Sequence, residues 1–277
     1  MDLQVVLPNE SAAMTPERPA HLAIAAEKLG FHTVWLPDHL LPPAEYGDVY
    51  AGVYEPLVTL THIAALTKSI RLGTSVLVVP MRDPFVLAKQ VATLDRLSGE
   101  RVTLGVGAGW DEEEFGLVGA DFRRRGKATD ETLGLLRHLF TTGRGPSGRG
   151  VFEPRPRGTV PIMVGGVSDA ALRRTATLAD EWQGVGLTPT QFRAHAERLR
   201  GMTDRPVRVG TRIAWHGDKN ALPAILEDVQ AFADAGADAL AVAFGPEAGF
   251  EDRMAEFATR TGPKPIPPMR PSSKCPV

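Results

Sequence analysis

An alternation of short apolar runs with helix-like segments extends along nearly the whole chain and constrains its fold more than any other feature. The apolar runs lie at residues 3–7, 33–36, 71–79, 102–107, 161–164, 182–185, 207–214 and 239–243. Segments with helical periodicity follow them at residues 20–29, 57–67, 84–97, 127–140, 169–178, 189–200, 221–235 and 247–259. The pattern therefore predicts eight consecutive strand–helix units.

The apolar runs are continuous rather than alternating, which is typical of strands covered on both faces. Eight strand–helix units in this length favour a single (β/α)8 barrel, a TIM barrel of class α/β, over residues 1–260. An open, doubly wound sheet is the alternative that the same pattern allows. Residues 261–277 contain six prolines and are predicted to form a disordered tail.

Charge and cysteine content exclude several classes of protein. Lys and Arg together number 31 and Asp and Glu 33, so the sequence shows no basic surface for nucleic acid or an anionic membrane. The single cysteine, Cys275, permits no intrachain disulfide and favours a reducing compartment. The sequence begins without a signal-peptide pattern and has no apolar run long enough to span a bilayer, so we expect a cytoplasmic protein. The seven histidines show no metal-ligand spacing.

The second apolar run ends in "WLPDHL", which places Asp38 and His39 directly after a buried strand. Active sites of (β/α)8 barrels lie at the carboxyl ends of the strands. A histidine there can transfer a proton near neutral pH, and an adjacent aspartate can orient it or a ligand. The structural alternative is that Asp38 caps a turn and His39 is a partly buried histidine without a catalytic role.

All three tyrosines lie in the loop that follows, residues 39–56. Tyr46, Tyr50 and Tyr54 can stack on a planar ligand at a pocket entrance, or they can anchor a long loop to the barrel. In the third run, Gly73 and Ser75 interrupt β-branched residues, which indicates either a bulge with close approach of a flat group or an ordinary strand.

The fourth run ends in "LGVGAGWDEEEF", in which glycines alternate as GxGxG. This spacing fails the GxGxxG fingerprint, and the four acids at residues 111–114 would repel a pyrophosphate, so a Rossmann site is disfavoured. Glycines here favour backbone lying against a ring system. The acids are also ordinary residues for a first helical turn, and Glu113 is a further candidate for proton transfer.

The fifth run ends in "VGGVSDAALRR", where Gly165 and Gly166 precede Ser168, a predicted helix N-cap. Free backbone N–H groups at such a helix start can bind an anion, although a simple capped turn explains the motif as well. The insertion at residues 141–160 is rich in Gly, Pro and Arg. The arginines of this insertion and of residues 123–125 could contact an anionic group, or each could be a solvated surface residue. These arginines are Arg123, Arg124, Arg125, Arg144, Arg149, Arg155 and Arg157.

Three blocks carry a resemblance to a known family. They read "LGFHTVWLPDHL" at 29–40, "IRLGTSVLVVPMRDPFVLAKQVATLDRLSGERVTLGVGAGW" at 70–110 and "VPIMVGGVSDAALRRTATLADEWQGVG" at 160–186. In this order they resemble the luciferase-like monooxygenase superfamily, and within it the shorter oxidoreductases that use coenzyme F420. The resemblance covers about residues 1–245 and implies a (β/α)8 barrel with a flavin or deazaflavin ring at the C-terminal end.

The resemblance also implies roles for particular residues. Asp38 and His39 match a pair that lines the ring pocket, and Ser75–Val76 matches a non-proline cis peptide that presses on the ring. Backbone along the cofactor corresponds to Gly107, Ala108 and Gly109. The phosphate-holding turn corresponds to Gly165, Gly166, Val167 and Ser168.

One position departs from the family pattern. The family often reads Ala-Asp-Gly-Trp where this chain has Ala179-Asp180-Glu181-Trp182, so Glu181 replaces the glycine. A glutamate adds a side chain and a charge there, at the end of the barrel away from the ring. The short chain favours F420 over FMN, and the basic insertion would suit the anionic tail of F420.

The sequence and the resemblance together predict an F420-dependent oxidoreductase. It would transfer a hydride between the deazaflavin and a small organic substrate, with His39 as general acid or base and Asp38 positioning it or a substrate group. The alternatives are an FMN-dependent monooxygenase with a separate flavin reductase, and a barrel that binds a coenzyme without catalysis. A homodimer, and an enzyme that reduces the cofactor, are expected partners.

Overall fold

The computed structural model describes residues 1–8, 14–42, 54–218 and 221–263. Its strands are β1 (Asp2–Val6), β2 (Thr33–Leu36), β3 (Arg71–Thr74), β4 (Leu77–Val78), β5 (Val102–Gly107), β6 (Ile162–Gly165), β7 (Glu181–Val185), β8 (Arg208–Ala214) and β9 (Ala239–Ala243). Its helices are α1 (Arg18–Leu29), α3 (Pro56–Leu66), α4 (Pro84–Ser98), α5 (Glu112–Leu117), α6 (Arg125–Thr142), α7 (Asp169–Leu178), α8 (Pro189–Arg200), α9 (Leu222–Asp234) and α10 (Phe250–Thr261). Two short 3-10 helices, η2 (Val79–Met81) and η3 (Phe122–Arg124), complete the elements.

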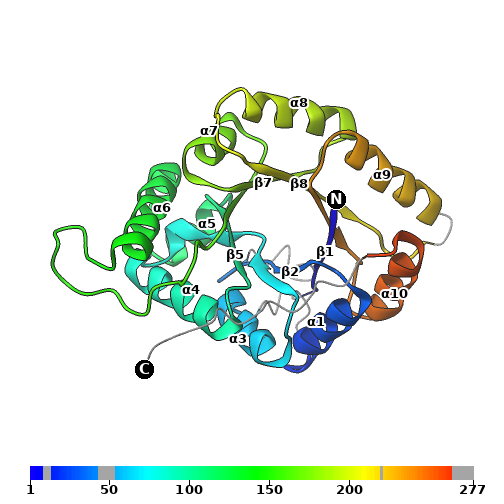
Figure 1. Cartoon of the computed structure of the whole chain (residues 1–277), viewed down its shortest axis with the longest axis horizontal. Helices are drawn as coiled ribbons and strands as arrows, with labels where there is room; N and C mark the ends of the chain where they lie inside the picture. Colours follow the sequence, from blue (N-terminus) through cyan, green and yellow to red (C-terminus); the bar gives the residue numbers. More distant parts are fainter. Residues whose placement is uncertain (9–13, 43–53, 219–220, 264–277) are drawn as a thin grey trace.

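The strands form one closed parallel barrel surrounded by helices (Figure 1). The hydrogen-bonded order is β3-β2-β1-β9-β8-β7-β6-β5-β4, and β3 also pairs with β5, which closes the sheet. Strands β3 and β4 are the two halves of the third barrel strand, so the barrel has eight strands. The predicted (β/α)8 barrel is confirmed, and the open-sheet alternative is wrong.

Helix α4 shows how the sequence determines where a helix begins and ends. At α4, Asp83 accepts hydrogen bonds from the N–H groups of Phe85 and Val86 at 3.0 and 2.9 Å, Pro84 occupies the first turn, and Gly99 ends the helix with φ 73°. The main apolar core lies between the strands and these helices. This packing fixes the strand ends, and with them the functional loops.

Trp35 fills the middle of the barrel. Its indole Nε1 donates to Gln4 Oε1 at 2.8 Å, and its side chain is almost fully buried. The neighbouring strand has Gly73 in register with Trp35, and a Cβ at Gly73 would lie 2.2 Å from the indole. The barrel is therefore a packed core at this level rather than an open pore.

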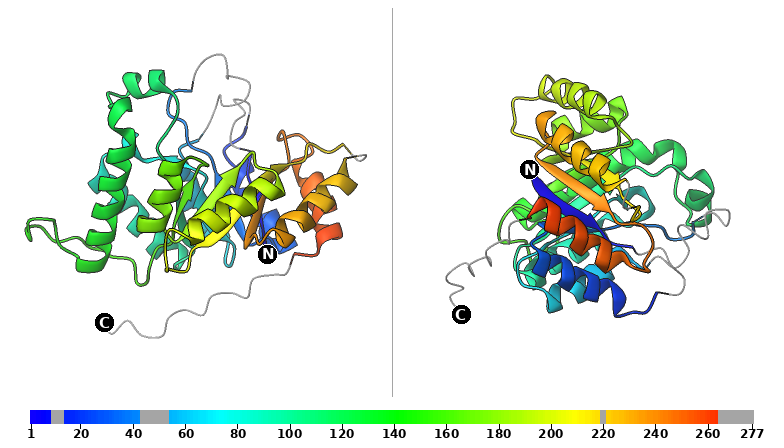
Figure 2. Two further views of the ribbon diagram at one scale, coloured as in Figure 1. Left: turned by 90° about the horizontal axis from the view of Figure 1, so that it is seen from above. Right: turned by 90° about the vertical axis from the view of Figure 1, so that its right-hand side faces the viewer.

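The two ends of the barrel have different surroundings (Figure 2). We call the end where the strands finish the mouth, and the opposite end the base. Helix α5 and residues 37–42, which follow β2, are at the mouth. The insertion at residues 141–160 joins the end of α6 to the start of β6 and therefore lies at the base, as Figure 2 shows.

Some predicted elements differ in detail from the structure. The third run forms two short strands and η2 instead of one strand over 71–79, because the chain bends at Ser75–Val76. The acids after the fourth run form α5, a helix of their own, with Asp111 as its N-cap. Tyr46, Tyr50 and the predicted disorder of residues 264–277 lie outside the described residues. Tyr54 donates from its hydroxyl to the Met14 carbonyl at 2.7 Å, so it connects two mouth segments.

Candidate active site

Asp38 lies at the end of β2 with a fully buried carboxylate. Its Oδ2 accepts from the Val78 N–H at 2.8 Å, and its Oδ1 accepts from Arg82 Nη2 at 2.6 Å. Burial raises the pKa of the Asp38 carboxyl, while Arg82 and the Val78 N–H act in the opposite direction. The two carboxylate oxygens thus fix the Val78 backbone and the Arg82 side chain at the end of the third barrel strand.

Arg82 extends this network to the start of α3. Its Nη1 donates to Glu55 Oε1 at 2.8 Å, and Glu55 also caps α3 by accepting from the Val58 N–H at 2.7 Å. The Asp38–Arg82–Glu55 chain therefore connects the ends of the second and third barrel strands to the start of α3. This arrangement stabilises the mouth and leaves no carboxylate oxygen of Asp38 directed at His39.

His39 is held instead by Glu114 of α5. The two side chains approach at 3.2 Å between Nδ1 and Oε2, and the Glu114 side chain is only 2% exposed. The other oxygen of Glu114 accepts from the N–H groups of Leu40 and Leu41 at 2.6 and 2.8 Å. Glu114 thus contacts both the His39 ring and the backbone that follows it, whereas Glu113 is exposed.

Exposed apolar side chains surround this histidine and continue around the mouth. The Trp110 ring lies edge-on to the His39 ring, with centroids 6.0 Å apart. The exposed large apolar residues at the strand ends are Leu40, Leu41, Trp110, Val167 and Val185. Such a group on one face is typical of a surface that binds a ligand or a partner.

The wall of the mouth beside His39 consists largely of backbone. The peptide bond between Ser75 and Val76 is cis, as the resemblance implies. The Val76 side chain lies between Gly107 of β5 and Gly165 of β6, because a Cβ at either glycine would come within 2.6 Å of a Val76 methyl group. Glycine is therefore required at both positions for Val76 to lie where it does, and the wall stays free of larger side chains.

A polar pair lies below this wall. The Ser75 hydroxyl donates to Gln183 Oε1 at 2.7 Å, and Gln183 is 4% exposed. The backbone N–H of Gly166 donates to the Gln183 carbonyl at 3.1 Å. Gln183 thus connects the cis peptide of the third barrel strand to the turn that follows β6.

That turn has the geometry of a helix start. Ser168 caps α7 by accepting from the Ala171 N–H at 3.2 Å, and Gly166 has φ 124°, which requires glycine. The Trp182 indole donates to the Gly166 carbonyl at 2.8 Å and fixes the turn from the outside. The first N–H groups of a helix have no carbonyl partner within the helix, so this turn can accept an anion. Val167, in the same turn, is exposed.

Gly109, which the resemblance places along the cofactor, has a local structural explanation. Gly109 has φ 83°, and a Cβ there would lie 2.6 Å from the Phe115 ring and 2.8 Å from Val78. The turn must therefore approach α5 closely, which is how α5 brings Glu114 to His39. Ala108 lies between the two glycines and is partly exposed toward the mouth end.

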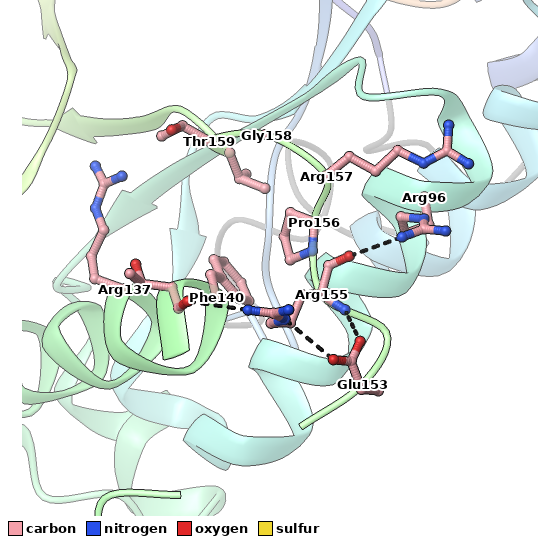
Figure 3. A pocket seen from close by; sticks show the side chains of 11 residues that line it. Arg96, Arg137, Phe140, Glu153, Arg155, Pro156, Arg157, Gly158 and Thr159 are labelled. Atoms are coloured by element: carbon pink, nitrogen blue, oxygen red, sulfur yellow. Dashed lines mark hydrogen bonds and ion pairs between the residues drawn. The ribbon is translucent and has the colours of Figure 1, made fainter. Parts of the chain in front are cut away.

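The basic insertion lies far from these residues. Around it is a cavity of about 630 Å³ at the base, lined by Arg96, Arg137, Arg155 and Arg157 together with Glu153 (Figure 3). Arg155 pairs with Glu153 at 3.2 Å, and Arg137 pairs with Asp180 at 2.5 Å. The arginines of residues 141–160 thus lie at the end of the barrel opposite to the mouth. Arg123, Arg124 and Arg125 are at the mouth end, at the start of α6.

The departure from the family pattern is accommodated at the base. Glu181 begins β7 and points into the barrel, where its carboxylate lies 3.8 Å from Arg208. Burial raises the pKa of Glu181, and Arg208 and Arg71 oppose this shift. The extra charge is thus neutralised far from the mouth.

Three mouth residues were not identified from the sequence: Glu114, Arg82 and Gln183. Glu114 is one of four consecutive acids, and only the position of α5 distinguishes it from its neighbours. Arg82 and Gln183 occur in ordinary sequence contexts, and their partners are 44 and 108 residues away.

Within the described residues, no group of three or more metal-ligating side chains occurs. No helix in this part of the chain is long and apolar enough to cross a membrane.

The barrel and its glycine-lined mouth define a known class of enzyme fold. The sequence model for luciferase-like monooxygenases matches residues 1–260. The chain therefore belongs to the luciferase-like monooxygenase family.

Relatives within the family have both unknown and known activities. An uncharacterised protein of Mycobacterium tuberculosis is 36% identical over 203 residues, which is 65% of this chain and 70% of the relative. An F420-dependent glucose-6-phosphate dehydrogenase of Nakamurella multipartita is 34% identical over 175 residues, 60% of this chain and 51% of the relative.

Solved structures share the fold at low sequence identity. Monooxygenase RslO1 from Streptomyces bottropensis has a TM-score of 0.75 at 19% identity, covering 95% of this chain and 99% of that one. An F420-dependent secondary alcohol dehydrogenase in complex with an F420–acetone adduct has a TM-score of 0.75 at 18% identity, covering 92% and 97%.

Proposed function

We propose that the protein is an F420-dependent oxidoreductase that transfers a hydride between the deazaflavin and a small organic substrate. The observation that carries the proposal is the pairing of His39 with buried Glu114 beside the wall of Val76, Gly107 and Gly165. This combination offers a proton-transfer group with a fixed ring orientation next to a surface bare enough for a flat ring.

The residues present fit such a ring. Val76 and the glycines give a flat apolar wall, and Gln183 and Ser75 supply hydrogen-bonding groups at its lower edge. The turn from Gly165 to Ser168 would hold a phosphate at the start of α7. A bound deazaflavin or flavin supplies the hydride chemistry that no side chain of this protein can perform.

The roles of the protein's own residues follow from their contacts. His39 would give or take a proton, with its ring orientation supported by the contact between Nδ1 and Glu114. Glu114 fixes the orientation of the imidazole and the backbone of the next two residues. Asp38 and Arg82 keep the mouth segments in place, and the exposed apolar side chains would exclude water from the substrate.

The relative from Nakamurella, named as F420-dependent, supports F420 as the coenzyme. The second candidate is an FMN-dependent monooxygenase that receives reduced flavin from a separate reductase. It is favoured by the family's description and by the fold shared with monooxygenase RslO1. The two candidates require different coenzymes at the same wall, so a binding measurement separates them.

The test is a fluorescence titration of the protein with oxidised F420 and with FMN. Gly107→Ala adds a Cβ 2.5 Å from a Val76 methyl group and should displace the wall. Gly134→Ala on α6, where a Cβ meets nothing within 4 Å, is the matched control. We expect tight binding of F420, about tenfold weaker binding by Gly107→Ala, and no change in the control.

Tighter binding of FMN than of F420 would replace the proposal with the monooxygenase. Tight F420 binding without turnover across a broad substrate panel would support a coenzyme-binding barrel without catalysis. Binding of neither coenzyme would overturn all three.

A further inference from the structure

One charged residue points into the barrel at the mouth and belongs to none of the networks described above. Side chains alternate along β8, so Arg208, Gly210 and Arg212 face the barrel interior. Arg208 is at the base with Glu181. Arg212 lies four residues further along the strand, roughly 13 Å in the direction of the mouth end.

The surroundings of Arg212 are apolar and small. Its neighbours in register are Val185 on β7 and Ala241 on β9. Val185 is exposed at the mouth, and Ala241 is part of the small apolar cluster inside the barrel with Ala243. Arg212 itself is neither fully buried nor fully exposed. Its neighbours therefore leave it space and offer it no charge of opposite sign.

Among the described residues, no hydrogen bond or ion pair engages the Arg212 guanidinium. This differs from the other inward-facing arginines, since Arg71 donates to the Val102 carbonyl at 3.0 Å and Arg208 pairs with Asp2 at 2.5 Å. A guanidinium is always charged and offers donors in a planar fork that matches a carboxylate or a phosphate. An inward guanidinium without a protein partner is suited to a ligand of that kind.

The position of Arg212 also determines which part of the site it serves. In a closed eight-stranded barrel, the strand four steps away lies opposite. From β8 the steps lead through β9, β1 and β2 to the third barrel strand, which carries Ser75 and Val76. Arg212 therefore faces the wall across the mouth. If a coenzyme ring lay against Val76, Arg212 would be on the opposite side of the mouth, where a substrate would bind.

We propose that Arg212 binds an anionic group, a carboxylate or a phosphate, of the molecule that reacts in the mouth. This inference rests on the proposed function for the location of the ring, and it adds that the substrate is an organic anion. The coenzyme's own phosphate is the other possible source of the same chemistry. The turn at Gly165–Ser168, two strands away, already offers a place for that phosphate, so the structure favours the substrate.

The experiment uses inorganic phosphate as the probe and three variants. Arg212→Met removes the charge while keeping a long side chain, and Arg212→Lys keeps the charge but removes the planar fork. Arg260→Met, an exposed arginine of α10, is the matched control. Phosphate binding is followed by phosphorus NMR line width, with the protein saturated with oxidised F420 and again without coenzyme. Unfolding temperatures check that each variant is folded.

We expect phosphate to bind about tenfold more weakly to Arg212→Met than to the wild type. Arg212→Lys should retain most of the binding and Arg260→Met all of it. Equal phosphate binding by the wild type and Arg212→Met would overturn the proposal. The measurement without coenzyme keeps this test valid even if F420 does not bind, so failure of the proposed function is recognised separately.

A second titration identifies the source of the anion. The variants are titrated with F420 and with its deazaflavin ring lacking the phosphate-bearing tail. Unchanged affinity of Arg212→Met for both supports an anionic substrate. Loss of affinity for F420 alone, with the ring compound still bound, would assign Arg212 to the coenzyme phosphate and overturn the substrate assignment.

Discussion

The two ends of the barrel contain charged side chains of the same kinds, but their partners differ. At the base, Arg208 pairs with Asp2 at 2.5 Å and lies 3.8 Å from Glu181. At the mouth, Arg212 of the same strand faces inward without a partner in the described part of the chain, and His39 has an acidic partner from a separate helix. The base thus neutralises its inward charges internally, whereas the mouth retains polar groups available to a ligand.

The two ends also differ in the side chains that line their hollows. The cavity of about 630 Å³ lies at the base, and its arginines contact carboxylates and carbonyl groups of the protein (Figure 3). The mouth is recognised instead by glycines that make room for Val76 and by an oriented histidine. Substitutions at the mouth should therefore change activity, and those at the base should change stability.

The largest expected effect is that of His39→Ala. If His39 transfers a proton, the variant should lose about 10²–10⁴-fold in kcat while it still binds F420. Steady-state kinetics with a substrate found by screening and a coenzyme titration provide the two measurements. Wild-type turnover by the variant would show that His39 has no catalytic role.

Glu114→Gln should have the next largest effect. The amide keeps the shape but removes the charge that faces His39 Nδ1 at 3.2 Å, so the imidazole loses its fixed orientation. We expect kcat to fall about tenfold or more, because hydrogen bonds to charged groups contribute about 1.5–3 kcal/mol. Glu113→Gln, an exposed neighbour, is the control and should behave as the wild type. An equal loss of kcat in Glu114→Gln and Glu113→Gln would show that Glu114 has no special role.

At the base, Arg208→Met should lower stability and leave kcat unchanged. Without Arg208, the carboxylates of Asp2 and Glu181 lose their shared cation, and because this ion pair is partly exposed the expected cost is about 0.5–1 kcal/mol. Urea unfolding gives the free energy of unfolding. The double variant Arg208→Met with Glu181→Gln should recover part of this loss, and a strictly additive result would show that the pair is not coupled.

The smallest effect concerns the pH dependence of stability. Asp95 is buried near the base end of α4, and burial together with the negative charge of Glu100 raises its pKa from 3.8 to about 6. A raised folded-state pKa means that the native state favours the protonated form, so the stability contributed by this group is lost as pH rises from about 4 to 6. Asp95→Asn should therefore raise the unfolding temperature more at pH 7.5 than at pH 4.5. A difference between variant and wild type that does not depend on pH would contradict this explanation.

The sequence was sufficient for the fold and for which residues lie at the carboxyl ends of the strands. Apolar runs with helices between them predicted the barrel, because parallel strands covered on both faces need continuous apolar sequence. The same pattern placed His39 and Gly107 at strand ends. The cis peptide at Ser75–Val76 agrees with the family resemblance. The local sequence pattern alone could not have predicted it.

The partners of the site residues could not be predicted, because they depend on distances between elements far apart in sequence. Asp38 was expected to position His39 or a substrate group; its oxygens contact Val78 and Arg82, and Glu114 contacts His39, none of which the sequence indicated. The inward direction of Arg212 also becomes evident only when the register of β8 is known. Local patterns place residues at an end of the barrel but do not determine which of them meet.

The most direct test of the account is a crystal structure of the protein with F420 bound. The account predicts that the deazaflavin ring lies at the mouth against Val76, between His39 and the strand that carries Arg212. A coenzyme bound in the arginine-lined cavity at the base would contradict the separation of roles between the two ends and the function proposed from it.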